Sequence, residues 1–146
     1  MGRQNRLKDE SNTCKKAAIQ KCLEARNKAI LLPYSHIKVG ACIYTKNGYC
    51  YEGFNIQNHC HKSYHAEEIA LLNCILHDVP SSMIEGIVVS FSENDIKRLT
   101  FMCGHCRQII WEYTRNPNLL VIEVDLEGNI IKEMKLDELY NYPYPR

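Results

Sequence analysis

FMCGHCRQII (residues 101–110) places two cysteines, Cys103 and Cys106, three positions apart. A pair with this spacing supplies half of a tetrahedral zinc shell. Either a second pair completes a closed structural site, or a third ligand leaves one position open for water. The stretch also opens segment 103–114, whose composition predicts a helix that stops near the Asn-Pro-Asn sequence at 116–118. The elements around this helix decide both the fold and the ligand that completes the site.

Outside this helix, the chain shows one order of helices and strands, without an internal repeat or linker. Hydrophobic spacing predicts an amphipathic helix over 13–32, ended by Pro33, and Asn47-Gly48 between two β-prone runs is a strong hairpin signal. The remaining predicted elements are strands at 39–45, 49–55, 86–91, 119–125 and 130–135, a helix at 65–76 and a short helix at 136–140. This order predicts an α/β sheet sandwich.

Composition restricts the class of protein. The chain has 146 residues, of which 45% are hydrophobic and 24% charged, and this is typical of one globular domain with a real core. The net charge of +1 lacks the cationic excess that binding many phosphates of a nucleic acid requires, so a small-molecule partner is favoured. No apolar run has the length of a membrane span, and the polar segment 1–14 does not resemble a secretory signal. We expect a cytoplasmic protein in which residues 1–11 are flexible.

Eight cysteines raise the alternative of a disulfide framework. Such frameworks belong mainly to secreted domains shorter than this one, so reduced thiols are the expectation. Cys22 and Cys74 fall in predicted helices and Cys42 in a predicted strand, where a free cysteine usually packs as a small apolar residue. We interpret Cys14 and Cys50 in the same way.

A ligand set for a catalytic metal can be assembled around the cysteine pair. Such a site needs three protein ligands and one vacant position, and His65, Cys103 and Cys106 supply the three. Glu67 follows the histidine by two positions, so it lies beside the metal without binding it. His-x-Glu followed by Cys-x-x-Cys is the signature of zinc-dependent nucleobase deaminases, in which the glutamate transfers protons.

Two alternatives compete with this interpretation. A Cys-x-x-Cys motif alone is also typical of a redox pair or of half a structural zinc site. In addition, His59, Cys60 and His61 lie close to His65 in the sequence and would allow a closed site with four protein ligands. The order of the two motifs, each at a helix start that follows a strand, favours the catalytic site.

The chain resembles the small, single-domain cytidine deaminases. The matching blocks are PYSHIKVGA (33–41), GFNIQN (53–58), HAEEIALL (65–72), CGHCRQII (103–110) and LDELYNYPY (136–144). The resemblance implies a three-layer α/β/α sandwich with a five-stranded mixed sheet over the single domain 1–146. It further implies one Zn²⁺ per chain, a small nucleoside as substrate and a homotetramer.

The resemblance also assigns roles to residues. Glu67 transfers protons during hydrolysis of cytidine or deoxycytidine to uridine or deoxyuridine and ammonia. The backbone of Ala66 holds the pyrimidine and Asn55 binds a ribose hydroxyl. Tyr144, in a tail over 141–146, reaches the site of a neighbouring subunit; Tyr142 is a second candidate for this role.

Several positions depart from the family pattern, among them His65, where many members carry a third cysteine. Gln57 replaces a glutamate that contacts the ribose, and Ile37 replaces a phenylalanine that contacts the nucleoside. Glu68 replaces an arginine that accompanies a third cysteine in many members, and Met102 replaces a proline. The changes in the pocket favour one alternative to cytidine deamination, a deaminase of a modified cytosine nucleoside such as blasticidin S. Two further alternatives are a polynucleotide-editing enzyme, which the near-neutral charge disfavours, and a non-enzymatic zinc module.

Overall fold

The computed structural model describes residues 3–92 and 102–143. Five strands form one sheet in the order β2-β1-β5-β6-β7. Their bounds are β1 Val39–Thr45, β2 Cys50–Phe54, β5 Ile84–Phe91, β6 Leu120–Val124 and β7 Ile130–Lys135. β5 and β6 are parallel, and the other neighbouring pairs are antiparallel. The predicted five-stranded mixed sheet is therefore confirmed.

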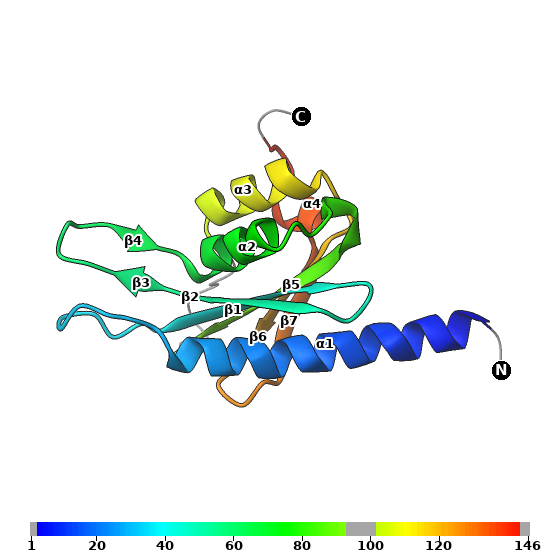
Figure 1. Cartoon of the computed structure of the whole chain (residues 1–146), viewed down its shortest axis with the longest axis horizontal. Coiled ribbons are helices and arrows are strands. Elements are labelled where there is room, and N and C mark those ends of the chain that lie inside the picture. The colour runs from blue at the N-terminus through cyan, green and yellow to red at the C-terminus, as the bar shows by residue number, and fades with distance from the viewer. Residues whose placement is uncertain (1–2, 93–101, 144–146) are drawn as a thin grey trace.

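Helices cover both faces of this sheet (Figure 1). Helix α1 (Arg3–Asn27) lies on one face, and α2 (Ala66–Leu76) and α3 (Gly104–Thr114) lie on the other. Successive residues of β1 point to opposite faces, so Ile43 packs with the α2 and α3 core whereas Tyr44 packs with the α1 core. The two cores give the three-layer α/β/α sandwich that the family resemblance implied.

Two glycines let the helices approach the sheet closely. A Cβ atom at Gly40 would lie 2.2 Å from the carbonyl oxygen of Cys22 in α1, and one at Gly53 would lie 2.2 Å from the carbonyl oxygen of Ala66 in α2. No side chain fits at such distances, so glycine is required where the helix backbone touches the strand. Gly53 thereby sets the position of the first turn of α2.

The hairpin predicted around Asn47-Gly48 is confirmed. β1 and β2 pair antiparallel, and the turn between them contains Gly48 with a φ of +87°. Asn47 accepts a hydrogen bond of 2.6 Å from the Thr45 hydroxyl, which stabilises the turn.

Helix α1 differs from the prediction at both ends. It was expected over 13–32 but extends over Arg3–Asn27, so residues 3–11, expected to be flexible, are helical. These residues include strong helix formers and no proline or glycine, and nothing in their composition stops the helix. At the other end, Ile30 leaves the helix to pair with Ile56, since its N–H donates to Asn55 and its carbonyl accepts from Gln57.

A short projecting hairpin was not predicted from the sequence. β3 (Ile56–Gln57) and β4 (Ser63–Tyr64) pair antiparallel and form an arm over residues 56–64 that extends from the body (Figure 1). Strands of two residues are too short to show an alternating pattern. The remaining elements are the 3-10 turn η1 (Ser81–Met83) and α4 (Leu136–Leu139), and α4 confirms the predicted short helix.

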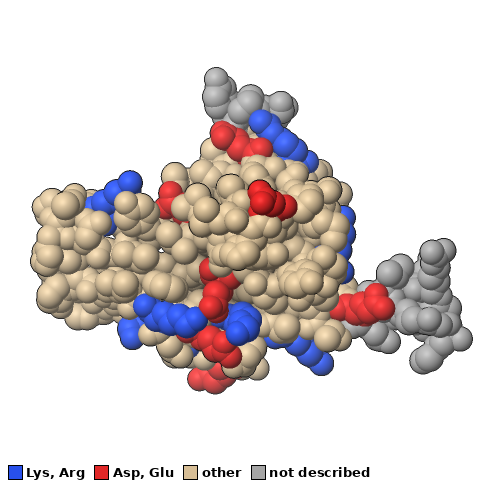
Figure 2. All heavy atoms as spheres, in the orientation of Figure 1, with Lys and Arg blue, Asp and Glu red and all other residues tan. Residues whose placement is uncertain are grey.

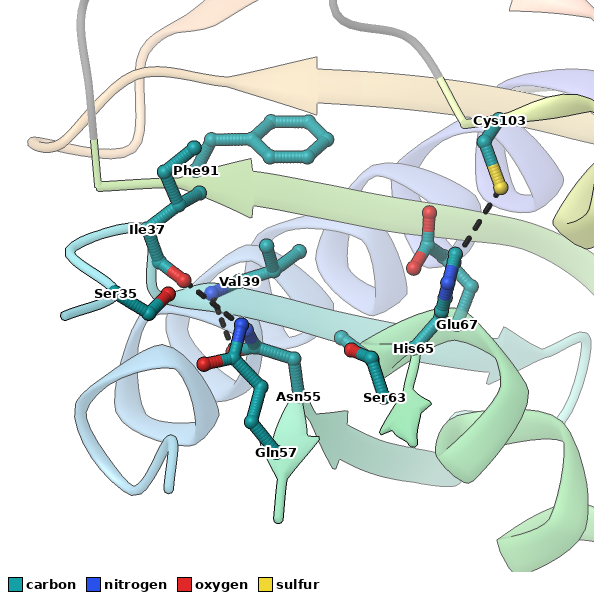
Figure 3. Close-up of a pocket in the computed structure, with 11 residues that line it drawn as sticks. Ser35, Ile37, Val39, Asn55, Gln57, Ser63, His65, Glu67, Phe91 and Cys103 are labelled. Atoms are coloured by element: carbon teal, nitrogen blue, oxygen red, sulfur yellow. Dashed lines mark hydrogen bonds between the residues drawn. The ribbon is translucent and has the colours of Figure 1, made fainter. Parts of the chain in front are cut away.

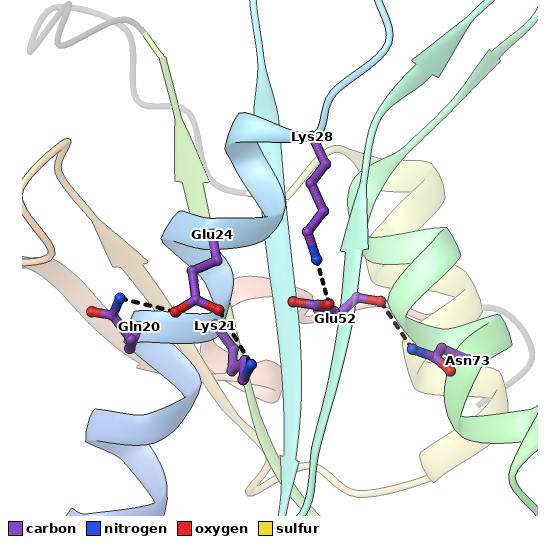
Figure 4. A network of polar contacts seen from close by, with 6 residues as sticks. All are labelled: Gln20, Lys21, Glu24, Lys28, Glu52 and Asn73. Carbon is purple, nitrogen blue, oxygen red and sulfur yellow. Dashed lines mark hydrogen bonds and ion pairs between the residues drawn. The ribbon is translucent and has the colours of Figure 1, made fainter.

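Polar contacts connect the layers at the edge of the sheet (Figure 4). Lys28, just after α1, forms an ion pair of 2.7 Å with Glu52 of β2, and the side chain of Asn73 in α2 donates to the backbone carbonyl of Glu52 at 3.1 Å. These contacts join β2 to the segment after α1 and to α2.

Three of the cysteines outside the predicted metal site lie in the interior of the domain. Cys22, Cys42 and Cys74 are fully buried, as expected for small apolar side chains. All eight cysteines are free thiols. Among the described helices, none combines the length and the apolar character needed to cross a membrane.

Candidate metal centre and pocket

The three predicted metal ligands come from the starts of two helices. His65 is the residue before α2 and Cys103 the residue before α3, and both have extended backbone conformations. Cys106 lies in the first turn of α3 and is fully buried, whereas Cys103 is exposed. The two helices lie side by side on one face of the sheet, so residues 38 to 41 positions apart meet at one point.

The distances within this cluster fit a tetrahedral metal site. The Nδ1 atom of His65 lies 3.3 Å from the Sγ atom of Cys103 and 3.4 Å from that of Cys106, and all three donor atoms lie within 4.8 Å of one another. Bond lengths typical of zinc place a nitrogen and a sulfur ligand about 3.6 Å apart in a tetrahedron. One nitrogen and two sulfur donors are also the ligand types that zinc prefers. The cluster therefore suits Zn²⁺ and leaves one position for a non-protein ligand.

The three other candidate ligands do not join this cluster. His59, Cys60 and His61 are exposed at the tip of the arm, where His61 has a φ of +57°. Within the described part of the chain, the group of possible metal ligands contains His65, Cys103 and Cys106 alone. A closed site with a fourth ligand from the arm therefore has no support in the geometry.

Glu67 lies beside the cluster on the first turn of α2. Its side chain is 4% exposed, and it lines the same pocket as His65 and Cys103. Burial raises the pKa of the Glu67 carboxyl group, and a backbone hydrogen bond and the nearby His65 and Cys106 offset part of this rise. A buried carboxyl group whose pKa lies above its usual value is suited to accepting and returning a proton.

The backbone around His65 is held by Glu68, the residue that departs from the family's arginine. One Glu68 oxygen accepts a hydrogen bond of 3.2 Å from the His65 backbone N–H, and the other lies 3.6 Å from Nε2 of His105. The rings of His65 and His105 meet edge to face with centroids 5.6 Å apart. Glu68 thus connects the starts of α2 and α3, which carry the cluster.

The segment before Cys103 is held from α3. Met102 is fully buried, and its carbonyl accepts a hydrogen bond of 2.6 Å from Nε of Arg107. Arg107 also donates to the carbonyl of Leu139 in α4. The arginine after the second cysteine therefore positions the first one, without a proline at position 102.

The cluster opens into a pocket of about 380 Å³ (Figure 3). This volume falls in the range of small-molecule sites. The lining comprises Ser35, Ile37, Val39, Asn55, Gln57, Ser63, His65, Ala66, Glu67, Phe91 and Cys103. Glu67 is the one acidic side chain among them, and it lies at the end of the pocket that contains His65 and Cys103 (Figure 3).

Asn55 is buried in the pocket wall and supports its backbone. Its Oδ1 atom accepts from the Val39 N–H at 2.8 Å, and its Nδ2 atom donates to the Ile37 carbonyl at 3.0 Å. An amide oxygen has two lone pairs and an amide nitrogen two hydrogens, so each atom retains one further hydrogen-bonding position. Gln57 is likewise engaged, because its Oε1 atom accepts from the Leu32 N–H at 3.2 Å.

The apolar wall contains Phe91 in addition to the residues predicted from the sequence. Ile37 lines the pocket as expected, and Phe91 at the end of β5 lines it as well. Ser92, the next residue, contacts the backbone of His36 and Lys38 through its hydroxyl, so the end of β5 is joined to the segment carrying Ile37. The position of Phe91 at the carboxyl end of a central strand was the available signal.

Tyr144, the predicted contact with a neighbouring subunit, lies outside the described residues. Tyr142, the second candidate, is 78% exposed.

Comparisons with known proteins agree with this geometry. Residues 12–121 match the family model described as the cytidine and deoxycytidylate deaminase zinc-binding region. A cytidine deaminase of Sporosarcina psychrophila is 32% identical over 108 residues, which cover 73% of this chain and 74% of that protein. Cytidine deaminase 3 of Arabidopsis thaliana is 30% identical over 112 residues, which cover 73% of this chain but 48% of that longer protein.

Solved structures show the same fold. The crystal structure of cytidine deaminase from Burkholderia pseudomallei matches with a TM-score of 0.76 at 27% identity, covering 88% of this chain and 98% of that one. Cytidine deaminase from Mycobacterium tuberculosis matches with a TM-score of 0.68 at 20% identity, covering 90% and 97% of the two chains, and this shows the fold alone.

A five-stranded mixed sheet with a His-Cys-Cys cluster at two helix starts is the architecture of a zinc-dependent deaminase. The match over residues 12–121 shows that the chain belongs to the cytidine and deoxycytidylate deaminase family.

Proposed function

We propose that this protein catalyses the hydrolytic deamination of cytidine or deoxycytidine to uridine or deoxyuridine, with release of ammonia. One observation carries the proposal: the buried carboxyl group of Glu67 lines the same pocket as an open three-donor cluster that suits zinc. His65, Cys103 and Cys106 would hold one Zn²⁺ per chain. When bound, the ion supplies a Lewis acid that makes a water molecule acidic near neutral pH.

Glu67 is the proton carrier in this proposal. Its carboxylate takes a proton from the attacking water and donates it to N3 of the cytosine ring as the new C–O bond forms at C4. It then carries the proton of the new C4 hydroxyl group to the amino group, which leaves as ammonia as the C4 carbonyl forms and the C–N bond breaks. Water and cytosine are thereby converted to uracil and ammonia, and Glu67 returns to its starting state.

The remaining pocket residues would position the nucleoside. The backbone of Ala66, adjacent to Glu67, would bind the pyrimidine. The free hydrogen-bonding positions of Asn55 and Gln57 would contact the sugar, at the side of the pocket away from Cys103 in Figure 3. Ile37 and Phe91 would cover the apolar surface of the ligand, and Phe91 supplies the aromatic ring that position 37 lacks.

A modified cytosine nucleoside such as blasticidin S is the second candidate substrate. The observation in its favour is Gln57, which puts a neutral amide where a charged carboxylate is expected to accept from a ribose hydroxyl, and whose oxygen already accepts from the Leu32 N–H. This exchange alters the sugar end of the pocket and leaves the reacting end unchanged.

Assembly and location remain predictions from the sequence. We propose a homotetramer in which the tail over 141–146, including Tyr144, reaches a neighbouring site, and a cytoplasmic protein without a nucleic-acid partner. Size-exclusion chromatography with light scattering would test the tetramer, and a single-chain mass would contradict it.

Ammonia release tests the proposed function. The zinc-loaded protein is incubated separately with cytidine, deoxycytidine, blasticidin S and a cytosine-containing single-stranded oligonucleotide. We expect stoichiometric ammonia and uridine from cytidine, or deoxyuridine from deoxycytidine. Release from blasticidin S alone would favour the second candidate. Release from the oligonucleotide alone would contradict the small-molecule proposal, and no release from any compound would favour a non-enzymatic zinc module.

A further inference from the structure

Four of the eight cysteines lie together in the layer between α1 and the sheet. Cys22 and Cys42 are buried in the core on the α1 side, and Cys14 and Cys50 pack against this core while remaining partly exposed. Cys106 of the metal cluster belongs to the other core, between the sheet and the helices α2 and α3. The four thiols on the α1 side therefore take no part in the proposed deamination, and their own chemistry can be considered separately.

Cys42 of β1 and Cys50 at the start of β2 are neighbours on one face of the hairpin. In the antiparallel register Cys50 lies opposite Tyr44, and Cys42 lies opposite Glu52. Because alternate residues of a strand point to the same face, Cys42, Tyr44 and Cys50 all point toward α1, and the two cysteines form a diagonal pair. Their thiol groups are joined by a hydrogen bond, so the two sulfur atoms face each other across the hairpin.

Cys50 is the member of this pair that solvent can reach. Cys42 is fully buried, and its thiol has the carbonyl oxygen of Ile43 at 3.7 Å as a second acceptor. The hydrogen bond from Cys42 lowers the pKa of the Cys50 thiol to about 7, although partial burial of Cys50 opposes this change. About half of Cys50 is therefore a thiolate near neutral pH, and the thiolate is the form that peroxides oxidise.

Charged side chains border the exposed side of Cys50. On the face shown in Figure 2, basic and acidic side chains gather over α1 and the neighbouring edge of the sheet. Lys21 of α1 and Glu52 of β2 lie at this edge (Figure 4), where the ammonium group lowers the pKa of Cys50 and the carboxylate raises it. Because these two charges act in opposite directions, the hydrogen bond from Cys42 has the largest effect on the Cys50 thiol.

Cys14 provides an internal comparison, because it is the other partly exposed thiol of the group. Its Sγ atom lies 3.7 Å from the position that a Cβ atom would take at Gly48, so Cys14 lies against the hairpin turn. Burial and the carboxylate of Glu85 raise the pKa of the Cys14 thiol. Cys14 is therefore near Cys50 but stays protonated near neutral pH, which makes it a poor nucleophile.

We propose that Cys42 and Cys50 form a reversible redox site, at which hydrogen peroxide converts the two thiols to a disulfide between β1 and β2. The Cys50 thiolate attacks one oxygen of the peroxide, the O–O bond breaks, and Cys50 becomes a sulfenic acid as hydroxide leaves and takes up a proton. The Cys42 sulfur then attacks the Cys50 sulfur, the S–O bond breaks, and a second water leaves with the Cys42 proton. In total the two thiols lose two electrons, and the peroxide becomes two molecules of water.

The diagonal arrangement is suited to a disulfide that is easily reduced. Diagonal neighbours in a sheet lie farther apart than the residues of an unstrained disulfide, so the new bond draws the two strands together. Strained disulfides have higher reduction potentials and are the labile ones. Two equivalents of a small thiol such as glutathione would therefore return both cysteines to the reduced state. No step involves the pocket, so this site does not depend on the proposed deamination.

Peptide mapping after peroxide treatment tests the site. Reduced, zinc-loaded protein is treated with a small excess of hydrogen peroxide, the remaining thiols are alkylated, and the protein is digested without reduction. Cleavage after Lys46 and Glu52 separates Cys42 and Cys50 from each other and from Cys60, so a linked pair of peptides identifies the bond. The same treatment is applied to Cys42→Ala and, as a matched control, to Cys14→Ala, and zinc content is measured throughout.

We expect wild-type protein to lose two hydrogens in mass, to yield the linked Cys42 and Cys50 peptides, and to regain both thiols with dithiothreitol. Cys50 should react at least about tenfold faster than Cys14, because it has the larger thiolate fraction. In Cys42→Ala the linked pair should be absent and Cys50 should accumulate as a sulfenic acid that dimedone traps. Cys14→Ala should form the disulfide at a rate within about twofold of the wild type.

Three results would overturn the inference. The first is a disulfide that joins Cys50 to Cys14 in wild-type protein, and the second is a Cys50 thiol that stays reduced while other cysteines are oxidised. The third is oxidation that begins at Cys103 or Cys106 with loss of zinc, since the metal centre would then be the redox-sensitive site. All three are read from the wild-type protein, so the test does not depend on the folding of either variant.

Discussion

The Nδ1 atom of His65 lies 3.4 Å from the Sγ atom of Cys106, although the two residues are 41 positions apart in the chain. His65 begins α2 and Cys106 lies in the first turn of α3, so the contact depends on both helices having the correct position on the sheet. The metal centre and the packing of the helices are therefore coupled, and a change to either should affect the other.

Replacing a ligand should remove the metal. For Cys106→Ala we expect bound zinc to fall from about one per chain to near zero and the thermal midpoint to drop, because two donors hold the ion poorly and its binding energy no longer stabilises the fold. Zinc content by mass spectrometry and thermal unfolding measure this. Cys60→Ser is the control, since Cys60 lies at the exposed tip of the arm. Zinc loss in the control would revive a site that includes the arm.

Gly53 and Gly104 differ in the space available for a side chain, so alanine substitutions at the two positions should differ in their effect on stability. Gly53→Ala should lower the free energy of unfolding by about 1–3 kcal/mol or more, because the new Cβ atom would overlap the Ala66 carbonyl and displace the start of α2. A Cβ atom at Gly104 meets nothing within 4 Å, so Gly104→Ala should stay within about 1 kcal/mol of the wild type. Chemical denaturation compares the two variants, and equal losses would argue against the close approach at Gly53.

Asn55 is expected to act on both stability and binding. Asn55→Ala leaves the Val39 N–H and the Ile37 carbonyl without their partner, which should cost about 1–3 kcal/mol of unfolding free energy. It should also raise KM, because the wall carrying Ile37 loses its support. Asn55→Asp keeps the acceptor for Val39 and should lose less stability. If Asn55→Ala changed KM with unaltered stability, Asn55 would contact the substrate alone.

Cys50 should be the more reactive member of a thiol pair. A hydrogen bond from Cys42 lowers the pKa of the Cys50 thiol to about 7, while the same contact and burial raise that of Cys42. Because the folded pKa lies below the usual value of 9.0, the thiolate contributes stability at high pH, and this contribution is lost as the pH falls through about 7.

Alkylation mapped by mass spectrometry from pH 6 to 9 measures this pKa. The rate at Cys50 should reach half its maximum near pH 7, and in Cys42→Ala the midpoint should move toward that of an ordinary thiol. A Cys50 midpoint unchanged by Cys42→Ala would contradict the hydrogen bond between them.

Much of the fold could be predicted because its signals are local. The hairpin turn at Asn47-Gly48 and the long buried strand β5 each carry a pattern within a few residues. The arm escaped prediction because its strands have two residues each and are held by Ile30, which lies 26 positions before Ile56. The early start of α1 lacks such a signal, because residues 3–12 are polar and charged and show no apolar spacing, although several of them favour a helix.

The candidate site likewise contains residues that the sequence predicts and contacts that it does not. The motif spacing was sufficient to select His65, Cys103 and Cys106, since their helix starts follow strands. The supporting contacts of Asn55 could not be predicted, because they join its side chain to the backbone of Val39 and Ile37, which lie 16 and 18 positions away in the sequence. Phe91 was not singled out, although its position at the end of β5 gave a signal. The surface between the arm and the segment after α1, which includes Tyr34 and His61, likewise depends on how these two segments lie, and no residue pattern reports that arrangement.

The most direct test of the account compares wild-type protein with Glu67→Gln for zinc content and for ammonia release from cytidine or the other cytosine compounds. We expect the variant to keep its zinc and to lose about 10²–10⁴-fold in deamination rate, because glutamine fills the buried position but carries no proton. Deamination retained at the wild-type rate would contradict the role of Glu67. Loss of the zinc together with the activity would make Glu67 part of the metal centre, contrary to the three-ligand site.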